Sequence, residues 1–259
     1  MRIAVVIPAY NEAGNIGRLI DETVAAVPEA SLQEVIVVDD ARDDETGAEI
    51  KAMLGRYKPL RYLRHGRRAG QSAALRSGVI AATAPVIATI DGGGQNDPAE
   101  IMRLVPRLGR DGREPALVGG LRKGRKAKGS RKSASRFANW IRDKVLADGC
   151  PDTGCGLKVY RREDYLALPY FSMHRYLPAL FLTYGHEIAY EPVNDRPRLK
   201  GASKYTNLGR ALIGLYDLVG VSWLRKRTLL RRLRNICRTQ IRPARRPAAS
   251  QVKVGASSK

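Results

Sequence analysis

Short apolar runs, each followed by polar or acidic residues, constrain the fold of this chain more than any other feature. Apolar runs lie at 3–7, 35–38, 86–90 and 117–119, and two further strand segments, 60–63 and 157–160, each contain one basic residue. Runs without polar alternation are typical of parallel strands whose two faces are both buried. Segments with helical spacing of apolar residues follow the early runs, at 16–27, 46–54, 71–82 and 98–108. This alternation predicts an α/β fold with a mostly parallel, doubly wound sheet.

The second half of the chain is less regular than the first. Helical spacing recurs at 135–146, 163–185 and 208–234. Proline and glycine interrupt the segment 195–205, which we expect to be a loop. The last residues have no periodicity and are rich in basic and small residues. We therefore predict one domain over 1–227 and a basic, disordered tail over 235–259.

Positive charge is concentrated in two places. The formal net charge is +21, and two acid-free stretches, 121–136 and 218–259, supply nearly all of that surplus. Such local patches suit a phosphate-bearing substrate and an anionic membrane surface at least as well as DNA. A nucleic-acid-binding protein is the alternative that the charge raises. Because only 6% of the residues are aromatic and no nucleic-acid-binding motif is present, we expect no nucleic-acid partner.

Cysteine usage and hydropathy indicate the compartment. The three cysteines, Cys150, Cys155 and Cys237, have no CxxC spacing, which favours a reducing compartment without structural disulfides. The sequence begins directly with an apolar run, so we expect no signal peptide. The longest apolar stretch, 211–224, is interrupted by Asp217 and is shorter than a spanning helix requires. We therefore do not expect the chain to cross a membrane by itself.

Five motifs occur in an order that resembles a known enzyme family. They are Ile7-Pro8-Ala9-Tyr10-Asn11-Glu12, Val37-Val38-Asp39-Asp40, Asp91-Gly92 with Gln95-Asn96-Asp97-Pro98, Asp152-Thr153 with Cys155-Gly156, and Arg196-Pro197-Arg198 with Gly201-Ala202-Ser203-Lys204-Tyr205. Together they resemble the family-2 glycosyltransferases, specifically the dolichol-phosphate mannose synthase type and its bacterial polyprenyl-phosphate relatives, over roughly residues 1–227. The resemblance implies a GT-A-type nucleotide-sugar-binding domain.

The resemblance also implies a reaction. A sugar would pass from a nucleotide-sugar, GDP-mannose or a UDP-sugar, to a polyprenyl or dolichyl phosphate, with inversion at the anomeric carbon. The product would be a lipid-phosphate-sugar used in glycolipid or cell-envelope biosynthesis. The sequence fixes neither the sugar nor the nucleotide. A catalytically impaired relative that binds nucleotide or lipid within a membrane complex is the alternative.

The first motifs are candidates for binding the donor. Pro8, Tyr10 and Glu12 lie in the loop after the first strand, where backbone and side chains can face the nucleotide. Asp39 ends the second strand, and a carboxylate there can accept directional hydrogen bonds from a base or ribose. The alternatives are that Asp39 only caps the strand end and that Tyr10 only forms a turn.

Asp91 is the principal acid of the predicted site. The family motif usually reads Asp-x-Asp with a downstream glutamine and holds a divalent cation against the donor diphosphate. In this chain Gly93 stands where the second acid is expected. Asp91 and Gln95 remain as ligands for Mg²⁺ or Mn²⁺, which favour oxygen donors. The missing acid puts the metal in doubt and motivates the impaired-relative alternative.

The remaining candidates suit a reaction between two phosphate-bearing substrates. A phosphate monoester is largely dianionic at neutral pH, so it needs no strong base to attack a sugar. Cations that hold the two substrates are needed instead, and Arg122, Arg136, Arg198 and Lys204 are the candidates. Asp152 matches a family acid near the reacting centre, although capping the following turn is the alternative.

The segment 208–234 joins apolar residues and Trp223 to an arginine cluster. This combination is typical of an interfacial helix on anionic lipid, and a core helix followed by a soluble basic tail is the alternative. We therefore expect a peripheral protein at the cytoplasmic face of a membrane, with a small transmembrane anchor protein as a possible partner. The three histidines, His65, His174 and His186, are too scattered for a metal site, and we expect surface or capping roles.

Overall fold

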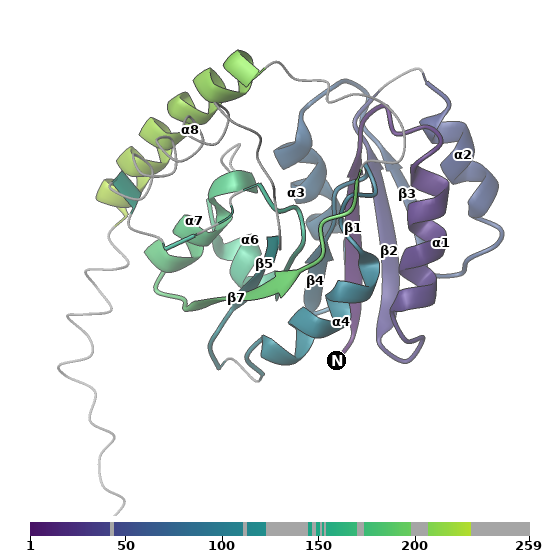
Figure 1. Ribbon diagram of the computed structural model, residues 1–259, viewed down its shortest axis with the longest axis horizontal. Helices are drawn as coiled ribbons and strands as arrows, with labels where there is room; N and C mark the ends of the chain where they lie inside the picture. Colours follow the sequence, from purple (N-terminus) through teal and green to yellow (C-terminus); the bar gives the residue numbers. More distant parts are fainter. Residues whose placement is uncertain are drawn as a thin grey trace, which may run out of the picture.

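A computed structural model gives the fold of the chain. It describes residues 1–41, 44–110, 113–122, 145–146, 149–150, 152, 154–169, 174–197 and 207–228, with side chains of the last segment from 214 onward. The described strands form one sheet in the order β3-β2-β1-β4-β6-β5-β7. Helices cover both of its faces (Figure 1). The predicted α/β fold with a mostly parallel sheet is therefore confirmed.

The parallel part of the sheet comes from the first half of the chain. It consists of β1 (Ile3–Ala9), β2 (Leu32–Asp39), β3 (Leu60–Arg64) and β4 (Val86–Thr89). β1 pairs in parallel with β2 and β4, and β2 pairs in parallel with β3. The three helices between them are α1 (Ile16–Ala26), α2 (Thr46–Met53) and α3 (Gln71–Ala81). These strands and helices agree with the segments that the apolar runs predict.

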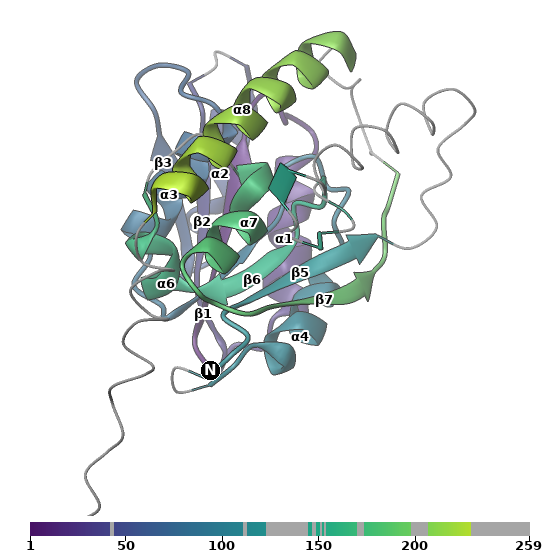
Figure 2. The ribbon, with the colours of Figure 1, turned by 90° about the vertical axis from the view of Figure 1, so that its left-hand side faces the viewer.

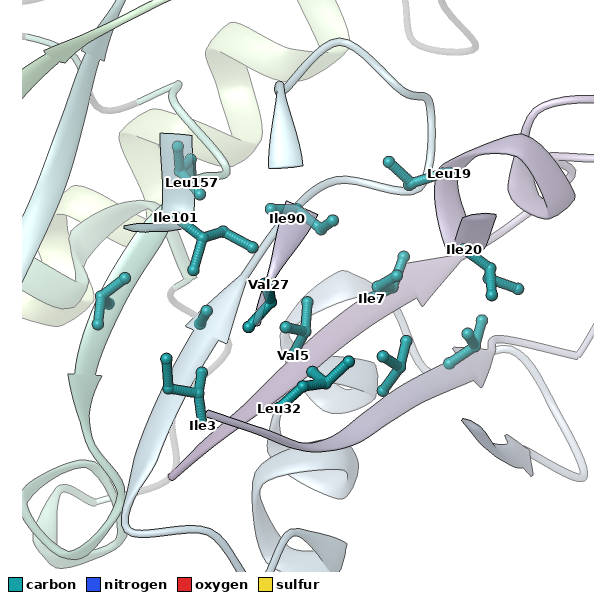
Figure 3. Close-up of a cluster of buried hydrophobic side chains, with 14 of the residues drawn as sticks. Ile3, Val5, Ile7, Leu19, Ile20, Val27, Leu32, Ile90, Ile101 and Leu157 are labelled. Atoms are coloured by element: carbon teal, nitrogen blue, oxygen red, sulfur yellow. The ribbon is translucent and has the colours of Figure 1, made fainter. Parts of the chain in front are cut away.

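Two hydrophobic cores lie on the two faces of the sheet. Alternate residues of β1 point to opposite sides, so Ile3, Val5 and Ile7 belong to one core and Ala4 and Val6 to the other. The first core packs α1 and α2 against the sheet, and Figure 3 shows its labelled side chains converging. The second core contains residues of α3 and of the later helices. Burial on both faces explains the uninterrupted apolar runs.

The remaining strands make the sheet mixed. They are β5 (Leu117–Arg122), β6 (Lys158–Arg161) and β7 (Ile188–Val193). β6 is antiparallel to β4 and β5, whereas β5 and β7 are parallel. The sequence analysis did not predict β7, which is only half-buried apart from Val193 and therefore has no apolar run. The charged residues Lys158 and Arg161 are buried in β6.

The predicted helix over 98–108 is interrupted. It is divided into η1 (Pro98–Glu100), α4 (Ile101–Leu104) and η2 (Val105–Arg107). Asp97 caps the start, because its side chain accepts a hydrogen bond from Ala99 N at 3.0 Å. Pro106 has no N–H to donate to the preceding turn, which explains why the α-helical part ends early.

The last described helices pack together on one face of the sheet. They are α6 (Arg162–Ala167), η3 (His174–Tyr176), α7 (Leu177–Thr183) and α8 (Asn207–Arg227). α8 crosses α7 on the outside (Figures 1 and 2). In the described ranges no helix combines the length and apolar character needed to cross a membrane. Nearly all of the predicted 135–146 helix, the end of 208–234 and the predicted tail 235–259 lie outside the described residues.

Candidate functional site

Topology brings the predicted motifs to one edge of the sheet. β1, β2, β4 and β5 run in the same direction, so Tyr10, Asp39, Asp91 and Arg122 all lie at or just beyond the carboxyl ends of strands. β6 runs in the opposite direction, so the segment that precedes it, with Asp152, reaches the same edge. This is the usual ligand-binding edge of an open α/β sheet.

Asp91 is held in one orientation by its neighbours. Its Oδ1 accepts a hydrogen bond from Gln71 Nε2 at 2.8 Å, and its backbone N donates to Asn96 Oδ1 at 3.2 Å. Gly156 leaves room for the carboxylate, because a Cβ there would lie 2.3 Å from Asp91 Cγ. Burial raises the pKa of Asp91 above its ordinary value, and the charges of Lys158 and Arg122 only partly offset that effect. A ligand that carries positive charge would relieve this penalty.

Arg122 and Asp152 form a partly buried ion pair. Arg122 Nε lies 2.7 Å from Asp152 Oδ2, and Arg122 Nη2 lies 2.8 Å from Asp152 Oδ1. Burial alone would lower the pKa of the guanidinium, but the hydrogen bonds and charge of Asp152 outweigh burial and raise it. Asp152 Oδ1 also accepts a hydrogen bond from Gly154 N at 3.1 Å, which is the capping contact, and its role near the reacting centre stays a prediction. The pair presents an oriented guanidinium at the end of β5.

Two residues that were not predicted for the site, Lys158 and Asn96, lie beside Asp91 and Cys155. Lys158 is buried in β6, its Nζ donates a hydrogen bond to the carbonyl of Cys155, and its charge acts on Asp91. Asn96 is buried, donates weakly to Cys155 Sγ at 3.9 Å and pairs through its backbone with Asp195. The quoted motif contains Asn96, which was a signal, whereas nothing in the sequence distinguishes Lys158 from a solvent-facing strand residue.

The donor side is built around two adjacent acids with different partners. Asp39 Oδ2 accepts a hydrogen bond from the hydroxyl of Tyr62 at 2.8 Å and lies 3.7 Å from Arg64 Nε. Asp40 instead accepts backbone hydrogen bonds from Ala69 N at 2.8 Å and Gly70 N at 2.7 Å. Asp40 therefore fixes the loop before α3, and Asp39 is the acid that remains for a ligand.

The loop after β1 packs against the segment of Asp91. A Cβ at Gly92 would lie 2.8 Å from the carbonyl oxygen of Pro8, so the two backbones touch. Glu12 is buried and its Oε2 accepts a hydrogen bond from Asn15 Nδ2 at 3.1 Å, which assigns it a structural contact. The Tyr10 ring has Arg68 Cζ 4.4 Å from its centroid, a cation–π contact across two loops.

Arg196, a third residue not predicted for the site, anchors the start of the loop 195–205, called the late loop below. Its guanidinium contacts Glu22 Oε2 at 2.7 Å and Asp97 Oδ1 at 2.6 Å, and its backbone N donates to the Gln95 carbonyl at 2.9 Å. The predicted site residues Arg198 and Lys204 follow directly in sequence but lie outside the described residues. Arg136 also lies outside them.

Comparison with known proteins gives the family. The sequence profile of glycosyl transferase family 2 matches residues 4–168. The chain belongs to glycosyl transferase family 2. The prediction made from its motifs is thereby confirmed.

Relatives of this glycosyl transferase include two curated bacterial proteins. It is 34% identical over 227 residues to the dodecaprenyl-phosphate galacturonate synthase of Rhizobium johnstonii. That alignment covers 85% of this chain and 66% of the synthase. It is 31% identical over 223 residues to the undecaprenyl-phosphate 4-deoxy-4-formamido-L-arabinose transferase of Sodalis glossinidius, covering 84% and 67%. The chain thus spans about two thirds of the length of these relatives.

Solved structures with the same fold include glucosyl-3-phosphoglycerate synthase from Mycobacterium tuberculosis. Its complex with Mn²⁺, UDP and phosphoglyceric acid has a TM-score of 0.64 at 21% identity and covers 86% of this chain and 78% of that chain. Its complex with Mg²⁺ and UDP has a TM-score of 0.65 at 21% identity, covering 85% and 79%. These likenesses confirm the GT-A-type fold.

The described residues of this glycosyl transferase offer few ligands for such a cation. Within them no group of three or more His, Cys, Asp or Glu side chains could hold a metal. Asp91 Oδ1 accepts the hydrogen bond of Gln71, which leaves Oδ2 for a cation, and Gln95 remains the second predicted ligand. Because Mg²⁺ commonly uses one or two protein ligands and takes the rest from phosphates and water, this minimal set fits it.

The three histidines have structural contacts. His65 lies between Asp40 Oδ1 and Ser77 Oγ, each 2.9 Å from a ring nitrogen. His174 is half-buried, and its Nδ1 lies 2.8 Å from Ser72 Oγ. Burial, with the charges of Arg175 and Lys158, lowers the pKa of His174 to about 3. None of these contacts indicates a catalytic histidine.

Proposed function

We propose that this chain transfers a sugar from a nucleotide-sugar to a polyprenyl phosphate, with inversion at the anomeric carbon. The observation that carries the proposal is the placement of Asp39, Asp91 and the Arg122–Asp152 pair along one edge of the sheet. The named substrates of the two polyprenyl-phosphate relatives, each aligned over more than four fifths of this chain, support the acceptor.

The reaction needs little proton chemistry. An oxygen of the acceptor phosphate attacks the anomeric carbon and forms the new C–O bond, while the bond from that carbon to the donor diphosphate breaks. The acceptor is already dianionic at neutral pH, and the leaving nucleoside diphosphate departs with the bonding electrons. Arg122, oriented by Asp152, and the predicted cations Arg136, Arg198 and Lys204 hold the two anions close and balance the developing charge.

A divalent cation belongs to the proposal as well. Asp91 Oδ2 and Gln95 are the residues that would hold Mg²⁺ or Mn²⁺ in this chain. When bound, the ion supplies positive charge to the diphosphate. The raised pKa of Asp91 supports this assignment, since a buried carboxylate without enough positive charge nearby favours a cation.

We further propose that α8 rests on an anionic membrane surface at the cytoplasmic face. Its outward side exposes Leu215 (54%), Tyr216 (79%), Val219 (64%) and Trp223 (60%), while Leu218 and Val221 are buried on the inward side. The exposed residues recur at helical spacing and form one stripe, and the exposed Lys226 and Arg227 continue it. An apolar stripe with basic residues at its end is suited to anionic lipid.

A panel of donors tests the reaction. Purified full-length protein is incubated with a short polyprenyl phosphate and GDP-mannose or UDP-sugars, with Mn²⁺, Mg²⁺ or EDTA, and formation of a charged glycolipid is measured. We expect one donor to be consumed in an acceptor-dependent manner. If no donor turns over and nucleotide still binds, the impaired-relative alternative, motivated by Gly93, replaces the enzyme proposal.

Vesicle binding tests the membrane surface. Trp223→Ser should weaken co-sedimentation with anionic vesicles several-fold, because it removes a large exposed side chain from the stripe. Ile80→Ser is the matched control, since Ile80 is equally exposed (58%) but lies on α3. Equal binding by both variants and wild type would contradict the proposal. Binding that requires native membranes would favour the small transmembrane anchor protein instead.

A further inference from the structure

Asp39 has one oxygen occupied and one without a partner. Its Oδ2 accepts a hydrogen bond from the Tyr62 hydroxyl at 2.8 Å. Its Oδ1 is buried and has no hydrogen-bond partner in the described part of the chain. Leaving a buried carboxylate oxygen without a hydrogen-bond donor is energetically unfavourable. This oxygen therefore points to a ligand that brings one N–H or O–H donor to it.

The position of Tyr62 is fixed by its strand and by the packing of α2. It lies in β3 opposite Val37 of β2, so its ring shares the face of the sheet that carries Asp39. Its hydroxyl reaches α2 at Gly47, where a Cβ would lie only 2.8 Å away. Burial and the hydrogen bond to Asp39 raise the pKa of Tyr62 to about 12, so the hydroxyl keeps its proton and donates it.

The donors around Asp39 lie at its occupied oxygen, Oδ2. Besides the Tyr62 hydroxyl, Arg64 Nε lies 3.7 Å from Asp39 Oδ2 at the end of β3. A base that binds at Asp39 therefore meets one free acceptor, Oδ1. Guanine presents two N–H donors side by side and suits a carboxylate with both oxygens free. Uracil presents one N–H between two carbonyl oxygens and suits a carboxylate with a single free acceptor.

We propose that Tyr62, by occupying the second oxygen of Asp39, makes the site select uridine-type over guanosine-type donors. The inference rests on the proposed function, since it takes Asp39 to face the base of the nucleotide-sugar. A guanine would leave its exocyclic amino group unpaired, and sites discriminate strongly against ligands that leave buried polar groups unpaired. Adenine and cytosine would place a ring-nitrogen lone pair against the carboxylate.

Calorimetric binding of UDP and GDP to the full-length protein tests the inference without requiring turnover. We expect wild type to bind UDP at least about tenfold more tightly than GDP, with and without Mn²⁺. Tyr62→Phe frees Oδ2 and should reduce the ratio of the two dissociation constants about tenfold. Tyr57→Phe is the matched control, because the Tyr57 hydroxyl donates to Asp21 at 2.6 Å and away from Asp39, and it should leave the ratio unchanged.

A second measurement needs no variant. The diphosphate of 3-methyluridine lacks the N–H that we assign to Asp39 Oδ1, so wild type should bind it at least tenfold more weakly than UDP. Equal binding of UDP and its methylated form, tighter binding of GDP than UDP, or an unchanged ratio in a folded Tyr62→Phe protein would each overturn the inference. Turnover of a GDP-sugar would overturn it while leaving the proposed function intact. Selective UDP binding without any turnover would support the inference and contradict the proposed function.

Discussion

Asp39 at the end of β2 is buried and Asp91 after β4 is half-buried. Both carboxylates lie on the same edge, but their surroundings differ. Asp39 and its neighbour Asp40 receive mostly neutral hydrogen-bond donors, namely the Tyr62 hydroxyl and backbone N–H groups. Asp91 lies instead among the charges of Lys158, Arg122 and Glu12. Neutral donors set direction, whereas buried charges set the local electrostatic potential.

This difference suggests a division of work along the edge. The Asp39 end is suited to recognising a neutral base by the pattern of its donors and acceptors. The Asp91 end is suited to anions whose charge changes during the reaction. Substitutions near Asp91 should therefore lower the rate, and substitutions near Asp39 should alter selectivity. The following variants test that division, beginning with the largest expected effect.

Asp91→Asn should lower turnover by about 10³-fold, because it removes the remaining strong anionic ligand for a cation at the diphosphate. Initial rates at saturating donor measure this. The amide can still accept the Gln71 hydrogen bond, so folding should survive. A variant with near-normal rate would mean that Asp91 is structural and that the two ends do not differ as described.

Asp91→Asn should also change the stability of the folded protein. Burial raises the pKa of Asp91, so the native state binds this proton more tightly than the unfolded chain does. Asp91 therefore lowers stability as the pH rises from its ordinary value of 3.8 through the raised native value. Asp91→Asn should melt at or above the wild-type temperature at neutral pH, and the difference should shrink toward acid pH. A large loss of stability at neutral pH would contradict this.

Arg122→Ala should lower the rate by about 10²-fold and destabilise the fold by about 3 kcal/mol, because it leaves Asp152 without its partner. Urea unfolding and initial rates measure the two effects. Adding Asp152→Ala should recover part of the stability but none of the rate. Recovery of the rate in the double variant would show that the pair is only structural.

Arg196→Ala should lower the rate of sugar transfer about tenfold, because it breaks the ion pairs of Arg196 with Glu22 and Asp97 that position the late loop. It removes none of the predicted phosphate contacts. Arg18→Ala is the control, because exposed Arg18 pairs with the same Glu22 at 2.7 Å. Its rate should match wild type, as surface pairs contribute little. Similar losses in both variants would assign the effect to Glu22 and α1 rather than to the loop.

Gly93→Asp should have the smallest effect, a few-fold rise in turnover with tighter Mn²⁺ binding, because it adds the second carboxylate near Asp91. Manganese titration and rates with and without EDTA measure this. Wild-type activity that survives chelation and does not improve in the variant would mean that the basic residues have replaced the metal.

The parallel half of the fold could be predicted because its strands are buried on both faces. Continuous apolar runs such as 3–7 and 35–38 are then best explained as buried parallel strands. Parallel strands end at the same edge of the sheet, so the acids that follow them lie along that edge. β7 could not be predicted in this way, and for β6 the segment 157–160 predicted a strand but not its direction or its neighbours. Buried Lys158 and Arg161 and the half-buried face of β7 carry no periodic signal, and the antiparallel direction of β6 is a property of the assembled sheet.

The sequence alone therefore determined the family, the fold class and the identity of Asp39, Asp91, Arg122 and Asp152 as candidates. The tertiary structure decided what each of them touches. Arg196 meets Glu22 from 174 residues away, and Tyr62 meets Asp39 from 23 residues away. Such contacts depend on which strands become neighbours, because hydrogen bonds act over a few ångströms in space and leave no local pattern in the chain.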